Sequence, residues 1–434
     1  MSLFPLDRLL SRFVRHGRLT VLDTAGKAAT FGNPSAQPAV TIRLVDPRLP
    51  WRLLYWPAVA VGEGYMNGGY VIESGTLREF LEILMASQTG IIGTNALYPL
   101  WRKIETVLRS QPMRTRLGLA ERNVRHHYDV GHSLYEMFLD EDLQYSCAYW
   151  ADGVTSLEEA QLEKKRHIAR KLVLQPGMEV LDIGSGWGGM ALYLAAEHNV
   201  KVTGVTLSKD QYETSVRRAR EAGLADRVTF KLLDYRLETG QYDRIVSVGM
   251  FEHVGRSRFR EFFTHLRRLL TDDGIALLHT IGKMQDPGPP NGWVTRYIFP
   301  GGYLPTMSEI APVTEQLGLW MTDIEVLRLH YAKTLQAWDE RFQARRDDVR
   351  AMFDERFCRM WEFYLQSAEM AFRFQELCNF QIQIAKKVGT VPLTRDYIYD
   401  HGRPAQAPPL AVVEDVRVPA TRPRQKKSTP VAAE

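Results

Sequence analysis

The chain of 434 residues contains little cysteine and no long apolar run. Its three cysteines, Cys147, Cys358 and Cys378, have no Cys-x-x-Cys spacing, which excludes a disulfide framework and zinc clusters of the usual kinds. No stretch reaches the roughly eighteen consecutive apolar residues of a membrane-spanning helix, and the first residues lack the apolar core of a secretory signal. We therefore expect a globular, cytoplasmic protein that holds no metal.

The excess of positive charge is also small. A formal charge of +4 is too low to predict a nucleic-acid partner. Near the N-terminus, however, Leu6, Leu9 and Phe13 share one side of a predicted helix, and Arg8 and Arg12 lie on another. Two interpretations stay open: a helix that lies on an anionic bilayer, or a surface helix packed on its own domain.

Three regions differ in composition. Residues 1–115 predict a small α/β domain, with a strand at 41–45 and a helix after the capping box at 76–79, whereas 61–69 is too glycine-rich for either element. Residues 116–400 predict the larger domain, in which 335–387 is expected to be helical. Residues 401–434 are rich in proline, alanine, valine and basic residues, and predict a disordered tail.

Strand and helix patterns alternate regularly in the larger domain. We expect strands at 179–183, 200–205, 227–232, 242–248 and 275–280, with helices at 187–197, 209–222 and 258–270 and another that ends near residue 172. This alternation predicts a doubly wound parallel sheet, which binds its ligands beyond the carboxyl ends of its strands.

The most specific single segment is 180–189, Val-Leu-Asp-Ile-Gly-Ser-Gly-Trp-Gly-Gly. Glycines between a strand and a helix let the backbone approach a nucleotide cofactor closely. A nicotinamide-binding protein would place a carboxylate at the end of the next strand, but Thr206 stands there. Asp182, just before the glycines, instead suits a class I S-adenosylmethionine (SAM) methyltransferase.

Ionisable side chains follow two neighbouring strands of the predicted sheet. Glu252 follows the strand that ends near Val248, and His279 ends the next strand. One such residue alone would be interpreted as a cap or a satisfied partner, and Cys147 alone as a buried small side chain. Two adjacent strand ends beside a glycine turn favour an active site.

The motifs together resemble the cyclopropane-fatty-acyl-phospholipid synthase family. They are Gln-Tyr-Ser-Cys-Ala-Tyr-Trp (144–150), the glycine segment, Gly-Val-Thr-Leu-Ser-Lys-Asp-Gln (204–211), Met-Phe-Glu-His-Val-Gly (250–255) and His-Thr-Ile-Gly (279–282). Their order and spacing match over roughly residues 120–390. The Gly-Glu-Gly-Tyr-Met-Asn-Gly segment at 62–68 is similar to an acidic glycine-rich turn in that family's first domain, whereas Gly-His-Ser at 131–133 departs from the family's Gly-Asn-Asp.

The resemblance implies a reaction: transfer of a methylene from SAM across the cis double bond of an acyl chain in a membrane phospholipid, with bicarbonate as the base. It implies that the anion is held by Cys147, Glu252, His279, the backbone of Ile281, and Tyr331. Because a carboxylate would repel the anion, Glu252 is expected to share a proton with it or to orient His279. The enzyme is expected to associate peripherally with the inner face of the membrane, and its first domain to contact membrane or a second subunit.

The SAM site implied by the resemblance is formed by loops after three strands and by the loop before the sheet. Its residues are Tyr128, Tyr145, Ser146, Asp182, Gly184, Gly186, Thr206, Leu207, Gln211 and Asp234. A strand-end turn is the alternative role for Asp234. Two other functions stay open: a lipid C-methyltransferase that leaves a methyl branch, and a lipid-binding protein without turnover.

Overall fold

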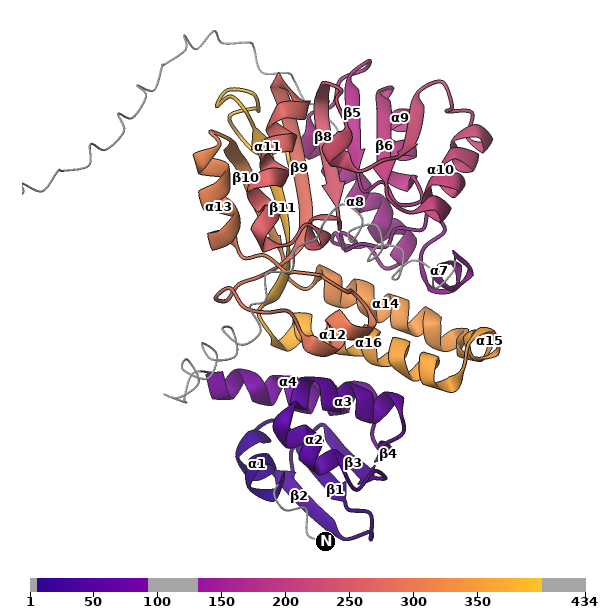
Figure 1. The fold of residues 1–434 in the computed structure, drawn as a ribbon, viewed down its shortest axis with the longest axis vertical. Helices are drawn as coiled ribbons and strands as arrows, with labels where there is room; N and C mark the ends of the chain where they lie inside the picture. The colour runs from indigo at the N-terminus through magenta and orange to yellow at the C-terminus, as the bar shows by residue number, and fades with distance from the viewer. Residues whose placement is uncertain (1–5, 93–131, 400–434) are drawn as a thin grey trace, which may run out of the picture.

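The computed structural model describes residues 6–92 and 132–399, which contain a four-stranded and a seven-stranded sheet (Figure 1). The predicted tail at 401–434 and the predicted boundary near residue 115 lie outside the described residues. Figure 1 shows helices α14 and α16 lying between the two sheets, and α3 and α4 of the N-terminal unit contact α16.

The N-terminal sheet has the strand order β2-β1-β3-β4. Its strands are β1 (Arg18–Leu22), β2 (Ala28–Gly32), β3 (Ala39–Leu44) and β4 (Tyr70–Ser74), and its helices are α1 (Leu6–Phe13), α2 (Leu49–Tyr55), α3 (Pro57–Met66) and α4 (Leu77–Ile92). Strand β1 pairs in parallel with β3, and the other two pairs are antiparallel. The predicted strand and capping box are confirmed: Thr76 and Glu79 exchange hydrogen bonds at the start of α4.

The expectation that 61–69 forms neither helix nor strand is wrong, because α3 extends through Met66. Gly62 lies against the indole of Trp293, where an added Cβ would come within 2.4 Å of the ring nitrogen. Gly64 lies against the ring of Tyr70 in the same way. The glycines are therefore needed for helix packing, which outweighs their low helix propensity.

The larger sheet has the order β10-β11-β9-β8-β5-β6-β7. Its strands are β5 (Glu179–Ile183), β6 (Lys201–Thr206), β7 (Val228–Leu232), β8 (Tyr242–Val248), β9 (Leu270–Lys283), β10 (Trp320–Leu327) and β11 (Leu377–Ala385). Strands β5 to β9 are parallel, and β11 is antiparallel to both of its neighbours. The doubly wound parallel core is as predicted, although β9 is longer than the expected 275–280.

Helices cover both faces of this sheet (Figure 1). The helices of the larger domain are α7 (His132–Phe138), α8 (Leu157–Leu172), α9 (Gly189–His198), α10 (Lys209–Glu221), α11 (Phe259–Leu269), α12 (Gly292–Tyr297), α13 (Met307–Gln316), α14 (His330–Ala344), α15 (Arg346–Met352), α16 (Glu355–Phe374) and α17 (Asp396–Tyr399). Three short 3-10 helices lie at Tyr235–Leu237, Phe251–His253 and Arg256–Arg258. The helices predicted around 172, 187–197, 209–222 and 258–270 are confirmed as α8, α9, α10 and α11.

The expectation that 335–387 is helical throughout is wrong at its end, because residues 377–385 form β11. Polar Asn379, Gln381 and Gln383 alternate there with apolar side chains, which is the period of a strand. All of them are buried, because helices cover both faces of the sheet. The strand period is therefore present in the sequence, and the expectation extended the preceding aromatic-rich helical pattern too far.

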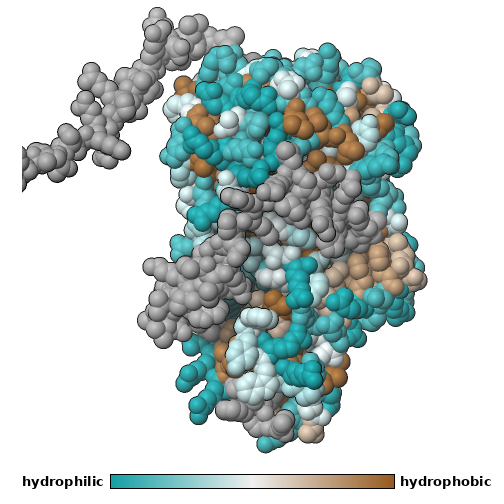
Figure 2. Space-filling model, viewed as in Figure 1, coloured by the Kyte–Doolittle hydropathy of each residue, from teal (hydrophilic) through white to brown (hydrophobic). Residues whose placement is uncertain are grey.

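Helix α1 packs on its own domain: Leu6 is buried, and Leu10 and Phe13 contact the core. Among the described residues, no helix is both long and apolar enough to cross a bilayer. Figure 2 shows apolar residues on one face of the molecule as separated patches among hydrophilic ones.

Candidate active site

A sharp turn joins β5 to α9 at the carboxyl edge of the sheet. Gly184 and Gly186 have φ values of +82° and +53°, which side chains with a Cβ rarely adopt. A Cβ on Gly184 would also lie 2.8 Å from Met250, whereas the space beside Gly186 is open. The turn therefore leaves room for a ligand directly against the backbone.

A cavity lies over this turn, and nine of the ten predicted cofactor residues line it. They are Tyr145, Ser146, Asp182, Gly184, Gly186, Thr206, Leu207, Gln211 and Asp234. The tenth, Tyr128, lies outside the described residues. Loops from four separate parts of the chain therefore converge on one cavity. His253, which was not among the predicted cofactor residues, also lines it.

Asp182 is the acidic group in this cavity that lacks a partner. Its side chain is buried, and Oδ2 has no hydrogen-bond partner in the described structure. Burial raises the pKa of Asp182 to about 7, although the nearby Lys164 lowers it. A buried carboxyl with a free oxygen suits a cationic group, such as the ammonium of SAM, so the residues present fit this cofactor.

The cavity-lining side chains that follow β6 and β7 already have hydrogen-bond partners within the protein. Thr206 Oγ1 donates to Gln211 Oε1 at 2.9 Å. Burial alone would raise the pKa of Asp234, but hydrogen bonds from Arg236 outweigh it and the pKa is lowered. The Asp234 carboxylate also caps the short helix that follows, so the turn role and a place in the cavity coexist.

Lys164 of α8 supports the loop that closes the cavity, and the sequence analysis missed it. Its ammonium donates to Gln144 Oε1 and to Ser146 Oγ, both at 2.7 Å, and the side chain is fully buried. Burial lowers the pKa of Lys164 to about 8, although Asp140 raises it. Gln161, one helical turn earlier, donates to the carbonyls of Gln144 and Ser146. The run Glu-Lys-Lys-Arg at 163–166 resembles a solvated helix face, which hid this role.

Glu252 and His279 lie at the ends of β8 and β9. Glu252 is buried, and its Oε1 accepts a hydrogen bond of 2.6 Å from the amide of Ile281, whereas Oε2 has no partner in the described structure. Burial raises the pKa of Glu252 to about 7. His279 Nδ1 lies 3.1 Å from Gln381 Nε2, and Nε2 of the ring has no partner among the described residues. Burial, helped by Lys164, lowers the pKa of His279, so the imidazole is neutral.

Cys147 lies in the loop before the sheet, and Tyr331 lies on α14. The amide of Ala148 donates to Thr334 Oγ1 at 3.1 Å, which fixes the loop against the helix that carries Tyr331. Cys147 is buried, which raises the pKa of its thiol. Ile281 packs against the core cluster that contains both Cys147 and Tyr331.

Aromatic rings pack around Tyr145 and Tyr331. The Tyr145 hydroxyl lies 2.9 Å from that of Tyr364, and the Tyr145 ring stacks on Trp338. The Tyr331 ring contacts Trp338 and Phe372. Among the described residues, no group of three or more His, Cys, Asp or Glu side chains could hold a metal ion. The arrangement therefore combines a polar cavity that suits a cation with a buried group of aromatic rings.

A family model described as mycolic acid cyclopropane synthetase matches residues 116–382. The cyclopropane-fatty-acyl-phospholipid synthase of Escherichia coli (strain K12) is 43% identical over 264 residues, covering 61% of this chain and 68% of the relative. A tuberculostearic acid methyltransferase of Mycobacterium tuberculosis is 36% identical over 388 residues, covering 86% and 89%. A solved mycolic acid cyclopropane synthase complexed with SAH and CTAB has 32% identity and a TM-score of 0.58, covering 61% and 97%.

Replacing Lys164 with Met should loosen the loop that it supports. Gln144 and Ser146 would lose their ammonium donor in a buried environment, which costs about 1–3 kcal/mol per unsatisfied group. We expect faster backbone hydrogen exchange at residues 144–148, measured by mass spectrometry. Lys165→Met is the matched control, because Lys165 bonds to Asp142 instead. Equal exchange in the two variants would contradict this role of Lys164.

Proposed function

Because the chain belongs to the mycolic acid cyclopropane synthetase family and is a SAM-dependent methyltransferase, we propose that it acts as a cyclopropane-fatty-acyl-phospholipid synthase. In the proposed reaction, the methyl carbon of SAM becomes a methylene bridging the cis double bond of a phospholipid acyl chain. The observation that carries this proposal is the presence of two buried ionisable groups, Glu252 and His279, at the ends of β8 and β9, next to the strand that leads into the glycine turn.

The chemistry of an alkene explains why buried groups of this kind are needed. SAM supplies an electrophilic methyl group, and attack by the alkene leaves a carbocation on the acyl chain. A base must then remove a proton from the new methyl group for the ring to close. Water in contact with the cation would capture it, so the site has to be dry.

We propose bicarbonate as that base. The thiol of Cys147 and the phenol of Tyr331 can donate hydrogen bonds to an anion, and we propose that they do so together with His279 Nε2, which has no partner in the described structure. A pKa of Glu252 near 7 allows its carboxyl to share a proton with the anion instead of repelling it. Gln381, rather than Glu252, is the hydrogen-bond partner of His279, so proton sharing is the role that we propose for Glu252.

Ile281 has a specific place in this proposal. Its amide donates to Glu252 Oε1, so the same amide can bind the anion only if the carboxyl moves away. Trp338 and Phe372 contact the Tyr331 ring, and Tyr145 stacks on Trp338; we propose that these rings exclude water and present π-faces that stabilise a cation without reacting with it.

Methyl branching of the acyl chain is the second candidate. A tuberculostearic acid methyltransferase aligns with 86% of this chain. Both outcomes share the carbocation, and they differ in the fate of the cation after methyl transfer. The surroundings of the proposed base therefore decide between ring and branch.

We also propose that the N-terminal unit docks on an anionic bilayer. Leu54, Tyr55 and Trp56 are consecutive exposed residues at the junction of α2 and α3, and the last two are each 70% exposed. Tyrosine and tryptophan favour the interface between lipid and water. Arg48 of the same segment and Arg12 of the adjacent α1 are exposed, which complements acidic lipid headgroups.

Replacement of Glu252 by Gln should abolish product without weakening SAM binding, because the amide cannot share its proton with an anion. Wild type and variant are incubated with SAM and vesicles of cis-monounsaturated phospholipid, and the acyl chains are analysed by mass spectrometry before and after ozone treatment. We expect the wild type to add one CH2 and remove the alkene. Undiminished turnover by Glu252→Gln would refute the proton-sharing role, and an ozone-sensitive product would favour branching.

The affinity for SAM should depend on the ionisation of Asp182. Only the carboxylate attracts the cationic cofactor, and the pKa of Asp182 is about 7 without ligand. We therefore expect affinity to fall up to about tenfold for each pH unit below 7 and to level off above it. In Asp182→Asn, calorimetric titration should find weaker binding with a flatter pH dependence. A slope as steep as that of the wild type would assign the pH dependence to another group.

Replacing Trp56 with Ser should weaken binding to phosphatidylglycerol vesicles by about tenfold, since burial of such a side chain contributes about 1.5–3 kcal/mol. Vesicle co-sedimentation measures the bound fraction. Trp320→Ser is the matched control, because Trp320 is 52% exposed on β10, in the other sheet. Equal vesicle binding by the two variants, or loss of self-association in Trp56→Ser instead, would contradict lipid docking.

A further inference from the structure

His279 and Gln381 form a buried cross-strand pair in the seven-stranded sheet. They are directly opposite each other on the antiparallel strands β9 and β11, and both are buried. Gln381 Nε2 lies 3.1 Å from His279 Nδ1. An amide nitrogen can only donate, so Nδ1 accepts and the single ring proton of the neutral imidazole lies on Nε2.

We infer that Gln381 is a positioning residue that fixes His279 in its Nε2-protonated tautomer. Nε2, which has no partner in the described structure, is then a hydrogen-bond donor at the pocket, not a proton acceptor. This inference rests on the proposed function, in which His279 then orients the anion by donating a hydrogen bond to it. The anion, not the imidazole, is then the base that closes the ring.

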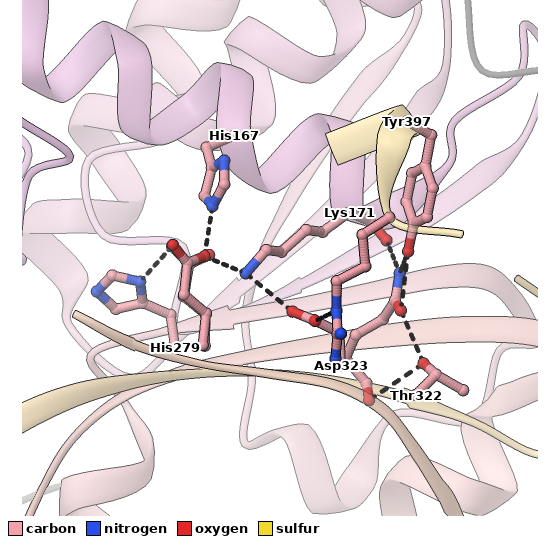
Figure 3. Close-up of polar contacts among 10 residues, drawn as sticks. His167, Lys171, His279, Thr322, Asp323 and Tyr397 are labelled. Carbon is pink, nitrogen blue, oxygen red and sulfur yellow. Dashed lines mark hydrogen bonds and ion pairs between the residues drawn. The ribbon is translucent and has the colours of Figure 1, made fainter. Parts of the chain in front are cut away.

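The charged side chains near Gln381 bind one another and not its amide. Figure 3 shows a network in which Glu325 accepts from His167 Nε2 at 2.6 Å and also binds Lys171, and Lys171 contacts Asp323 at 3.3 Å. These charges compensate one another within the network. Among the described residues, Gln381 is the hydrogen-bond partner of the His279 ring, so the tautomer depends on this amide.

Gln383 provides a matched control on the same strand. It lies two residues from Gln381, on the same face of β11, and is equally buried. Its side chain binds the Lys171 carbonyl, Thr322 and Tyr397 (Figure 3). A variant of Gln383 therefore removes a buried amide from β11 without removing the partner of His279.

The test is nitrogen NMR of the full chain labelled with 15N-histidine, with His279→Asn used to assign the signal. The wild type and Gln383→Leu should show the Nε2-protonated form of His279 from about pH 6 to about pH 8. Gln381→Leu should give a mixture of tautomers. Gln381→Glu should shift the proton to Nδ1, because a carboxylate accepts from it. Thermal unfolding of each variant establishes that it is folded.

Turnover is measured in parallel. We expect Gln381→Leu to lower kcat about 10- to 100-fold, the usual effect of removing a partner that orients a functional histidine, with little change in KM for SAM. Gln383→Leu should retain most of its kcat. An Nδ1-protonated ring in the wild type, or a tautomer unaffected by Gln381→Leu, would overturn the inference. The expected tautomer in a protein that forms no cyclopropane would instead refute the proposed function.

Discussion

The active site depends on burying ionisable groups without giving each one an opposite charge. Asp182 and Glu252 lie at the carboxyl edge of the seven-stranded sheet, and desolvation brings the pKa of each to about 7. Desolvation also keeps His279 neutral. A site of this kind can change its protonation state when a cation or an anion enters, whereas fixed ion pairs would resist both ligands.

The rest of the fold maintains this condition. Strand order places the ends of β5, β8 and β9 side by side, which brings the glycine turn, Glu252 and His279 to one edge. Lys164 donates a hydrogen bond to Ser146 in the loop before the sheet, and Thr334 of α14 accepts one from the amide of Ala148 in the same loop. The glycines of α3 let the N-terminal unit pack against Trp293 of the larger domain. The buried site is thus supported by helices of the larger domain, which in turn packs against the N-terminal unit.

Local patterns made much of this predictable from the sequence. The glycine turn and the strand ends that carry Glu252 and His279 follow from short motifs and regular alternation. Lys164 was not predictable, because its place in a charged run conceals that tertiary packing buries it. Strand β11 and its Gln381 were missed although residues 378–384 alternate between apolar and polar, because the aromatic-rich helical pattern directly before them was taken to continue. Helix α3 was missed because packing against Trp293 and Tyr70 overrides glycine's low propensity.

The central claim is that a small anion, held in a neutral pocket, removes the proton that closes the ring. The most direct measurement is the rate of cyclopropane formation in buffer purged of carbon dioxide, as bicarbonate is added back at constant pH and ionic strength. The account predicts a low initial rate that rises and saturates with bicarbonate, while SAM binding stays unchanged. A rate that is full without bicarbonate would contradict it and would assign the base to a side chain of the protein.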